Sequence, residues 1–277
     1  MAALSRPVLC HFHIFKNAGT SLDGALKREF GIGFAEHDGP RPNYCLAPEE
    51  VRAFVEPRAA LRAFSSHQVR FPLPEIAGLR WLTAFLLRHP LDRAASVYRF
   101  ERKQRGSSPG AIHAKRLDLS GYVRWRIAQG KHNLLCDFQT AFLSSNPALG
   151  ARRAELPIAL ARLEEAAILG SVERMDESLA CAERTLAADF PGLDLSCRPQ
   201  NVSGARKAEF AERLAELRAE LGEALFAELE ERNQKDFALL ARMDELLNTR
   251  LSALPDSAAA VAEFKSRCAS RRGAEVA

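Results

Sequence analysis

The residues best suited to chemistry lie between positions 13 and 21, where the sequence is His-Ile-Phe-Lys-Asn-Ala-Gly-Thr-Ser. An apolar run ends at Ile14 and a helical pattern begins at Gly19, which predicts a strand, a short loop and a helix start. The first amides of a helix have no partner within it, and the helix dipole adds positive charge there. The segment therefore predicts a site for a phosphate-like group, formed by Lys16, Asn17, Ala18, Gly19, Thr20 and Ser21.

The order of residues separates this loop from the P-loop nucleotidases. Their pattern, GxxxxGK[ST], places a Lys directly before the hydroxyl residue and a Gly at the start of the loop. Here Lys16 lies before Gly19 and Thr20 with other residues between, and no Gly precedes it in the loop. Taken alone, the motif is also consistent with a capped helix that binds nothing.

A second set of candidate residues follows the apolar run 81–87, which is typical of a strand buried on both faces. Pro90 suits the first turn of a helix, so Arg88 is expected at the end of a strand and Ser96 about two turns into the next helix. Both side chains could then reach the cleft above the sheet, where α/β proteins bind ligands. The alternative is that Arg88 only pairs with Asp92.

Together the two motifs resemble those of sulfotransferases that use 3′-phosphoadenosine 5′-phosphosulfate (PAPS). The order Lys-x-x-Gly-Thr-Ser is similar to their 5′-phosphosulfate loop, and Arg88-His89-Pro90 followed by Ser96 is similar to their 3′-phosphate motif. The chain resembles in particular the group of heparan sulfate 2-O-sulfotransferase and its bacterial relatives. The resemblance implies that Arg88 and Ser96 hold the 3′-phosphate of PAPS.

Further segments follow the same family, so that the resemblance spans roughly residues 8–250. His67 lies between the two motifs, where that group carries its catalytic His, although Ser65 and Ser66 stand where many relatives have a Gly. Gly19 stands where the animal enzyme has a Ser. The remaining segments that match in order are Asn133, Phe138-Gln139-Thr140, 168–179, Asn201-Val202-Ser203 and 233–240.

His67 is the candidate base, because an imidazole with an ordinary pKa near 6.5 can remove a hydroxyl proton at neutral pH. A packed or surface histidine is the alternative. His11 and His13 share a face of the first strand and, with Cys10, suggest a metal, but no third ligand on that face is evident. We therefore predict no metal site, and we assign His89 a structural role.

The resemblance implies a sulfotransferase that moves the sulfuryl group of PAPS to an acceptor hydroxyl, most plausibly of a carbohydrate. Lys16 would stabilise the leaving oxygen, the amides 17–20 would hold the 5′-phosphate, and His67 would act as base. Two alternatives are an ATP-dependent small-molecule kinase and a non-catalytic nucleotide-binding protein. The absence of GK[ST] argues against the first, and the joint presence of Lys16, His67, Arg88 and Ser96 argues against the second.

Composition adds bounds on class and location. The chain has 277 residues, 47% of them hydrophobic, with 39 basic and 35 acidic residues and a net charge of +4, which gives no case for a nucleic-acid partner. The six cysteines show no CxxC spacing, and most are expected to be reduced core residues. No secretion signal or membrane span is evident. A cytoplasmic protein of bacterial origin is therefore expected.

The expected fold is a three-layer, P-loop-like α/β domain over residues 1–254, with a mostly parallel sheet, a helix-rich C-terminal half and a loosely ordered tail over 255–277. Strands are expected near 8–14, 61–66, 81–88 and 167–172, and helices near 20–30, 48–55, 90–104 and 119–129. The region 101–118 is expected to be a mobile loop. Leucines spaced by three and four over 206–250 predict a helix or helix pair, packed on the domain or forming the seam of a homodimer.

Overall fold

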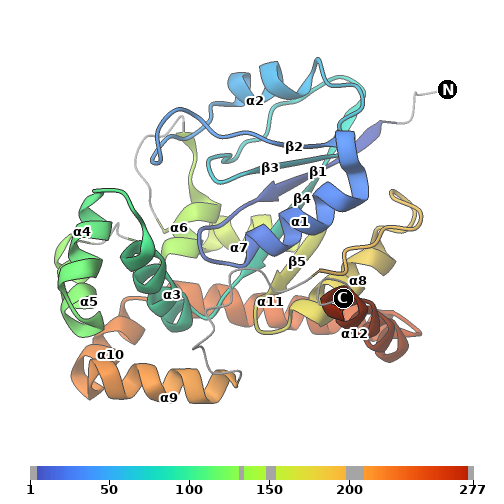
Figure 1. The fold of residues 1–277 in the computed structure, drawn as a ribbon. Coiled ribbons are helices and arrows are strands. Elements are labelled where there is room, and N and C mark those ends of the chain that lie inside the picture. Colours follow the sequence, from blue (N-terminus) through green and yellow to red (C-terminus); the bar gives the residue numbers. More distant parts are fainter. Residues whose placement is uncertain (1–4, 131–133, 148–153, 198–208, 274–277) are drawn as a thin grey trace.

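A computed structural model describes residues 5–130, 134–147, 154–197 and 209–273, and its centre is a five-stranded, all-parallel sheet (Figure 1). The strand order is β2-β3-β1-β4-β5. The bounds are β1 Arg6–Phe12, β2 Phe34–Glu36, β3 Ala63–Ser66, β4 Leu79–Leu87 and β5 Ile168–Ser171. The predicted α/β class and parallel sheet are confirmed, and the short edge strand β2 is an addition.

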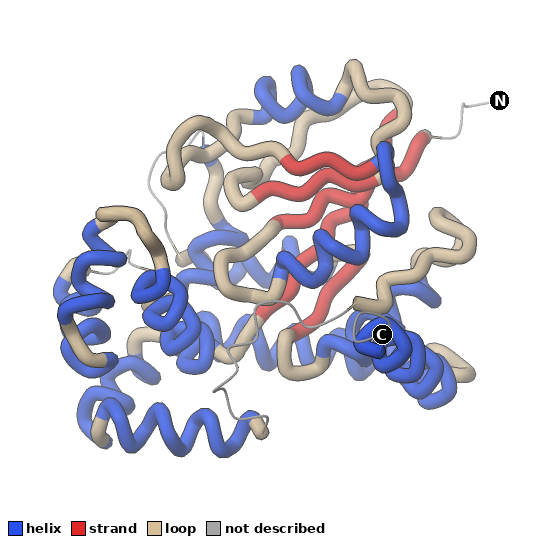
Figure 2. The backbone as a smooth tube through the Cα atoms, viewed as in Figure 1, coloured by secondary structure: helices blue, strands red, loops and turns tan. Residues whose placement is uncertain are grey.

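Helices cover both faces of this sheet, which gives three layers (Figure 2). Side chains of a strand alternate between faces, so Cys10 packs in one apolar core and Leu9 in the other. The Cys10 core is completed by α2 Pro48–Val55, α6 Phe138–Ser144, α7 Leu156–Glu164 and α11 Gln234–Ala253. The Leu9 core is completed by α1 Gly19–Phe30, α8 Met175–Thr185 and α12 Ser257–Gly273.

A third apolar core lies beside the sheet, between helices on the left of Figure 1. Its helices are α3 Pro90–Lys103, α4 Pro109–Arg116, α5 Leu119–Ala128, α9 Phe210–Leu221 and α10 Glu223–Glu231. The predicted helical region 206–250 therefore contains α9, α10 and most of α11. Leu217, Leu221 and Leu225 pack against α3 and α5, whereas Leu239 packs against the sheet, so the described helices pack on the domain.

Two sequence-based expectations are wrong, and both concern segments predicted to be loosely ordered. The region 101–118 is not one mobile loop, because residues 109–116 form α4. Ser108 accepts a hydrogen bond from the amide of Ala111 at 3.2 Å, and Pro109 occupies the first helical turn, which together start the helix. The C-terminal tail is not loosely ordered over 257–273, because Phe264 and Cys268 of α12 are buried in the Leu9 core.

Other sequence features are placed as follows. All six cysteines are free thiols, and five of them are buried, as expected of core residues. Across the described part of the chain, no helix combines the length and the apolar character that crossing a membrane requires. Asn133 and the segment 201–203 lie outside the described residues.

Candidate functional site

The predicted anion loop connects β1 to α1 at the carboxyl edge of the sheet. Lys16 and Ala18 have left-handed backbones, with φ of 69° and 58°. Left-handed residues within such a loop turn successive amides toward one concave side, which favours an anion there. The amides of Ala18, Gly19 and Thr20 make no hydrogen bond within the described chain, as expected at a helix start. The loop therefore offers the donors that the sequence predicts at these three positions.

Asn17 has a different role from the one predicted for its amide. This amide donates to the Ile14 carbonyl at 3.2 Å, so it is already used in the turn. The Asn17 side chain is buried, and its Nδ2 donates to the Leu86 carbonyl at 2.8 Å and to Oε1 of Gln139 at 2.7 Å. Asn17 therefore fixes the loop against the end of β4.

Gln139 links the loop to the second motif from the first turn of α6. Its Oε1 also accepts from the Arg88 amide at 2.8 Å, and its Nε2 donates to the Arg88 carbonyl at 2.9 Å and to Asp236 at 3.2 Å. Asp236, in the first turn of α11, also accepts from the amide and hydroxyl of Thr140 at 2.7 and 2.8 Å. One buried amide thus joins the loop, the end of β4 and two helix starts.

Arg88 lies directly after β4, as predicted, and its guanidinium reaches the anion loop. Its Nη1 donates to the Lys16 carbonyl at 3.0 Å, so the structure brings the two motifs together. Its Nε and Nη2 donate to Asp92 at 3.0 and 2.8 Å, and this ion pair is buried. The alternative pairing considered from the sequence therefore exists alongside the contact with the loop.

Additional guanidiniums gather at this corner. Arg213 of α9 lies 3.4 Å from the other oxygen of Asp92, so two guanidiniums share one carboxylate. The buried Arg93 points at the Phe15 and Leu134 carbonyls, and burial lowers its pKa to about 10, which keeps it charged at neutral pH. We call Lys16, Arg88, Arg93 and Arg213 the basic corner. The sequence did not indicate Arg93 or Arg213.

The other predicted cofactor-binding side chains lie on α1 and α3. Ser96 is half-buried in α3, eight residues after Arg88. Thr20 is exposed and Ser21 is buried in the first turn of α1. The Lys16 ammonium lies over the Phe100 ring of α3, 4.5 Å from its centroid. This cation–π contact joins the loop to α3.

His67 follows β3, on the other side of the loop from the basic corner, and is about half exposed. Its Nδ1 lies 2.9 Å from Asp38, which also accepts from the His67 amide at 2.9 Å and from the Ser66 hydroxyl at 2.8 Å. Burial raises the pKa of Asp38, but hydrogen bonds from His67 and Ser66 outweigh it and leave that pKa below its ordinary value. An ionised Asp38 holds the proton on Nδ1 and leaves Nε2 to accept a proton.

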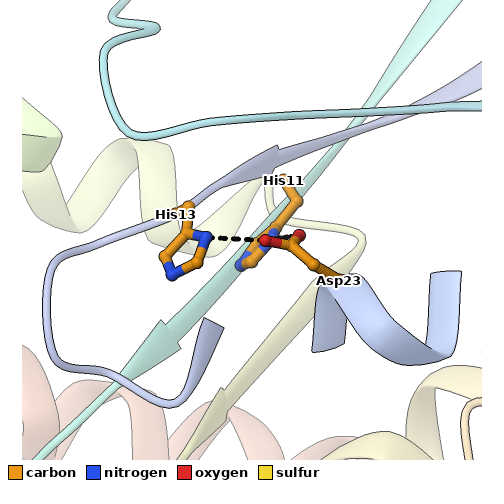
Figure 3. A group of neighbouring side chains, drawn as sticks. All are labelled: His11, His13 and Asp23. Carbon is orange, nitrogen blue, oxygen red and sulfur yellow. Dashed lines mark hydrogen bonds and ion pairs between the residues drawn. The ribbon is translucent and has the colours of Figure 1, made fainter. Parts of the chain in front are cut away.

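The ring of His13 stacks on the ring of His67, with centroids 3.9 Å apart. His13 and His11 both turn toward Asp23 of α1 (Figure 3), with Nδ1 atoms 2.6 and 2.7 Å from its two oxygens. Gly19 is required next to this ring, since a Cβ there would lie 2.2 Å from His13. A Ser at position 19 would therefore need His13 to move.

Burial and the neighbouring charges shift the pKa values of Asp23 and His13. Burial raises the pKa of Asp23, but the charge and hydrogen bonds of His11 and His13 outweigh it and hold that pKa well below its ordinary value. Burial lowers the pKa of His13 more than Asp23 raises it. The cluster therefore contains an ionised carboxylate that accepts hydrogen bonds from the imidazoles around it.

Together with His11 and His13, Asp23 forms a group of three side chains of types that can bind a metal. The sequence did not indicate Asp23 as the third member. Cys10 is excluded from this group because it points to the opposite face of the sheet. Ligands of a tetrahedral zinc ion lie about 3.3 Å apart when its bonds are about 2.0–2.1 Å. The nitrogen–oxygen distances of 2.6 and 2.7 Å are those of hydrogen bonds, so the two Nδ1 atoms and the Asp23 carboxylate could ligate one metal ion only after moving apart.

A pocket of about 220 Å³ opens beside His67, where β1, β2 and β3 end. Its walls include the carboxylates of Asp23, Glu36 and Asp38 and the imidazoles of His13, His37 and His67. Two serines, at positions 65 and 66, complete the lining. This is the position at which parallel α/β sheets commonly bind ligands. We call it the acidic pocket.

Sequence reasoning identified the candidate base but missed its partners. Asp38 lies 29 residues before His67 in the chain, in a segment without a recognisable motif. Asp23 lies in the first turns of the helix that follows the anion loop, on the face that contacts His13. Its short distance in sequence from the loop could therefore have indicated it. Gln139 was noted only through the family resemblance, and its contacts with Asn17 and Arg88 give that position a physical role.

Replacing Gln139 by Leu should strongly destabilise the fold. The change leaves the Arg88 amide and carbonyl without their buried partner, at about 1–3 kcal/mol for each such group, and removes one of the hydrogen bonds of Asn17 and of Asp236. We expect the free energy of unfolding, measured in urea, to fall by about 2–4 kcal/mol. Gln129→Leu, at an exposed position, is the control and should change it by less than about 0.5 kcal/mol. Equal losses in both variants would contradict this role of Gln139.

The lowered pKa of His13 predicts a stability change below pH 6.5. The unfolded chain then binds a proton that the folded chain does not, so acidification favours unfolding. Between pH 7.5 and 5.5 this single group can remove up to about 1.4 kcal/mol. His13→Asn keeps a side-chain donor toward Asp23 but cannot titrate, so it should lose less stability over this interval. The free energy of unfolding is measured in urea for both proteins at pH 7.5 and 5.5. Equal losses in the two proteins would show that His13 does not titrate in this way.

Comparison with known proteins gives one relative of nearly the same length. No protein-family model matches the chain. An uncharacterized protein of Archaeoglobus fulgidus is 30% identical over 248 residues, which cover 88% of this chain and 98% of the archaeal protein. The alignment therefore includes nearly all of the archaeal chain rather than one shared motif. At this identity and coverage, the chain belongs to the same family as the archaeal protein.

Proposed function

We propose that the protein is a sulfotransferase that moves the sulfuryl group of PAPS to an acceptor hydroxyl, most plausibly on a carbohydrate. The observation that carries the proposal is the contact of Arg88 with the Lys16 carbonyl at 3.0 Å. It joins two motifs, 72 residues apart, that resemble the two phosphate sites of PAPS-dependent enzymes. One donor molecule bearing two anionic groups could then be held by the loop at one end and by the basic corner at the other.

The chemistry divides among the residues by position. The amides of Ala18, Gly19 and Thr20 would bind the 5′-phosphate, and Arg88 with Ser96 would bind the 3′-phosphate. The acceptor oxygen would form a bond to sulfur as the bond from sulfur to the 5′-phosphate oxygen breaks, and the electron pair would leave with that oxygen. Lys16 would stabilise the developing negative charge, as cations do in phosphoryl transfer. Nε2 of His67 would take the hydroxyl proton.

The cytoplasm is the proposed location, since PAPS is made there, and no nucleic-acid partner is proposed. A carbohydrate acceptor and a homodimer also stay predictions. An ATP-dependent kinase remains the competing hypothesis for the same loop. It differs in one measurable respect, because ATP has no 3′-phosphate for Arg88 and Ser96 to bind.

Calorimetric titration with 3′-phosphoadenosine 5′-phosphate (PAP), AMP and ATP tests the donor site. We expect PAP to bind at least about tenfold more tightly than AMP or ATP, because the 3′-phosphate adds charge-assisted hydrogen bonds. Ser96→Ala should weaken PAP binding by about fivefold, and Arg88→Ala by about 10- to 100-fold, with AMP binding nearly unchanged.

Arg116→Ala, on the exposed surface of α4, is the matched control and should bind PAP as the wild type does. Because Arg88 is buried beside Asp92, its variant must first be checked for folding, and Ser96→Ala keeps the test valid if Arg88→Ala unfolds. Equal affinity for ATP would favour the kinase, and failure of all three nucleotides to bind would reject the proposed donor site.

His67→Ala and Asp38→Asn test the base through PAP release from PAPS in the presence of a panel of sugar acceptors. Loss of a general base should lower turnover by about 10²- to 10⁴-fold, and loss of the oriented tautomer in Asp38→Asn should lower it by up to about 10⁴-fold. PAP affinity should stay at the wild-type value in both variants. His113→Ala, on α4 and outside the pocket, is the control. Full turnover in His67→Ala would leave the donor site standing and remove His67 as the base.

A further inference from the structure

The acidic pocket and the basic corner lie on opposite sides of the anion loop, and their charges are opposite. The pocket is bordered by three carboxylates, from Asp23, Glu36 and Asp38, and by no Lys or Arg among its lining residues in the described chain. Arg70 follows His67 closely, but its guanidinium is buried over the Phe142 ring. The pocket therefore has a negative potential that its own walls do not neutralise with a permanent cation.

Glu36 is the carboxylate best placed to meet a ligand. It ends the edge strand β2, where it pairs with Ser65 two residues before His67, and it is exposed. Within the described chain its carboxylate makes no hydrogen bond or ion pair, whereas Asp23 and Asp38 are already bonded to imidazoles. Glu36 therefore adds a negative charge at the pocket mouth that serves no contact of the fold.

The lining also limits the chemical class of the acceptor. Among the described residues that line the pocket there is no aliphatic side chain and no Phe, Tyr or Trp, which disfavours phenols and hydrophobic alcohols, since apolar ligands need apolar walls. A volume of about 220 Å³ is below the roughly 300–1,000 Å³ of sites for drug-sized ligands, so the pocket fits a small polar group. Three carboxylates would repel an acidic polysaccharide.

We propose that the acceptor is a hydroxylated amine, such as an amino sugar, whose ammonium group pairs with Glu36 and Asp38 while its hydroxyl meets His67. The inference rests on the proposed sulfotransferase function and narrows its substrate class. Donor and acceptor would then be sorted by charge, with the anionic nucleotide on the basic corner and the cationic sugar in the acidic pocket.

Glucosamine and N-acetylglucosamine, as monomers and as tetramers, form the test pair, because acetylation removes the charge and keeps the ring. Their binding is measured by calorimetry at pH 6.5, with and without saturating PAP. We expect the glucosamine compounds to bind about tenfold more tightly. In Glu36→Gln this preference should disappear while PAP affinity is unchanged, and Glu49→Gln, an exposed carboxylate of α2 outside the pocket, should keep it.

The outcomes separate this inference from the proposed function. Equal affinity for charged and acetylated sugars, or binding of neither, overturns the cationic acceptor even if PAP binds as proposed. A preference that survives in Glu36→Gln overturns the assignment to this pocket. If PAP fails to bind while glucosamine is still preferred through Glu36, the cation site stands and the sulfotransferase proposal falls.

Discussion

The side-chain amide of Gln139 is the interaction on which the arrangement of the site depends. It is completely buried, and both its oxygen and its nitrogen are shared between segments far apart in the chain. An amide in this position cannot shift without leaving the backbone of Arg88 unpaired and breaking its bond with Asn17, and unpaired buried groups are costly. The distance between the anion loop and the end of β4 is therefore set by hydrogen bonds rather than by apolar packing alone.

The same network extends into the C-terminal half of the chain through mutual capping of two helices. Asp236 of α11 accepts from the first amides of α6, and Asp137, before α6, accepts from the amides of Lys235 and Asp236. Each helix start thus receives a carboxylate from the other, which satisfies unpaired amides and complements both dipoles. This explains why polar residues at 137–140 and 233–236 lie in an otherwise apolar region.

Sequence reasoning located the elements with strong local signals. The apolar runs near 8–14 and 81–88 correspond to β1 and β4, and Pro90 stands at the start of α3 as expected. It missed β2, which has three residues and is too short for a periodic pattern. It also missed the packing of α12, because Phe264 and Cys268 are buried in the Leu9 core, where α12 lies against α8 through contacts that no local pattern encodes.

In the candidate site, sequence order indicated Lys16, His67 and Arg88, but not how far each is committed to other partners. Arg88 is paired with Asp92, and the amide of Asn17 is used within the turn. The carboxylates that orient the histidines could not be found in this way, since the Asp38–His67 contact depends on the neighbouring positions of β2 and β3 in the sheet. Pairings of this kind follow from topology rather than from spacing.

Because Gly19 has no side chain, the ring of His13 can contact both the start of α1 and the acidic pocket. The His13 ring occupies the space beside Gly19, and it also stacks on His67. Any shift of the first turn of α1 toward an anion therefore changes the support of an imidazole in the neighbouring pocket. Linkage requires such an effect to be reciprocal: if an anion at the loop strengthens binding in the pocket, a ligand in the pocket strengthens anion binding by the same factor.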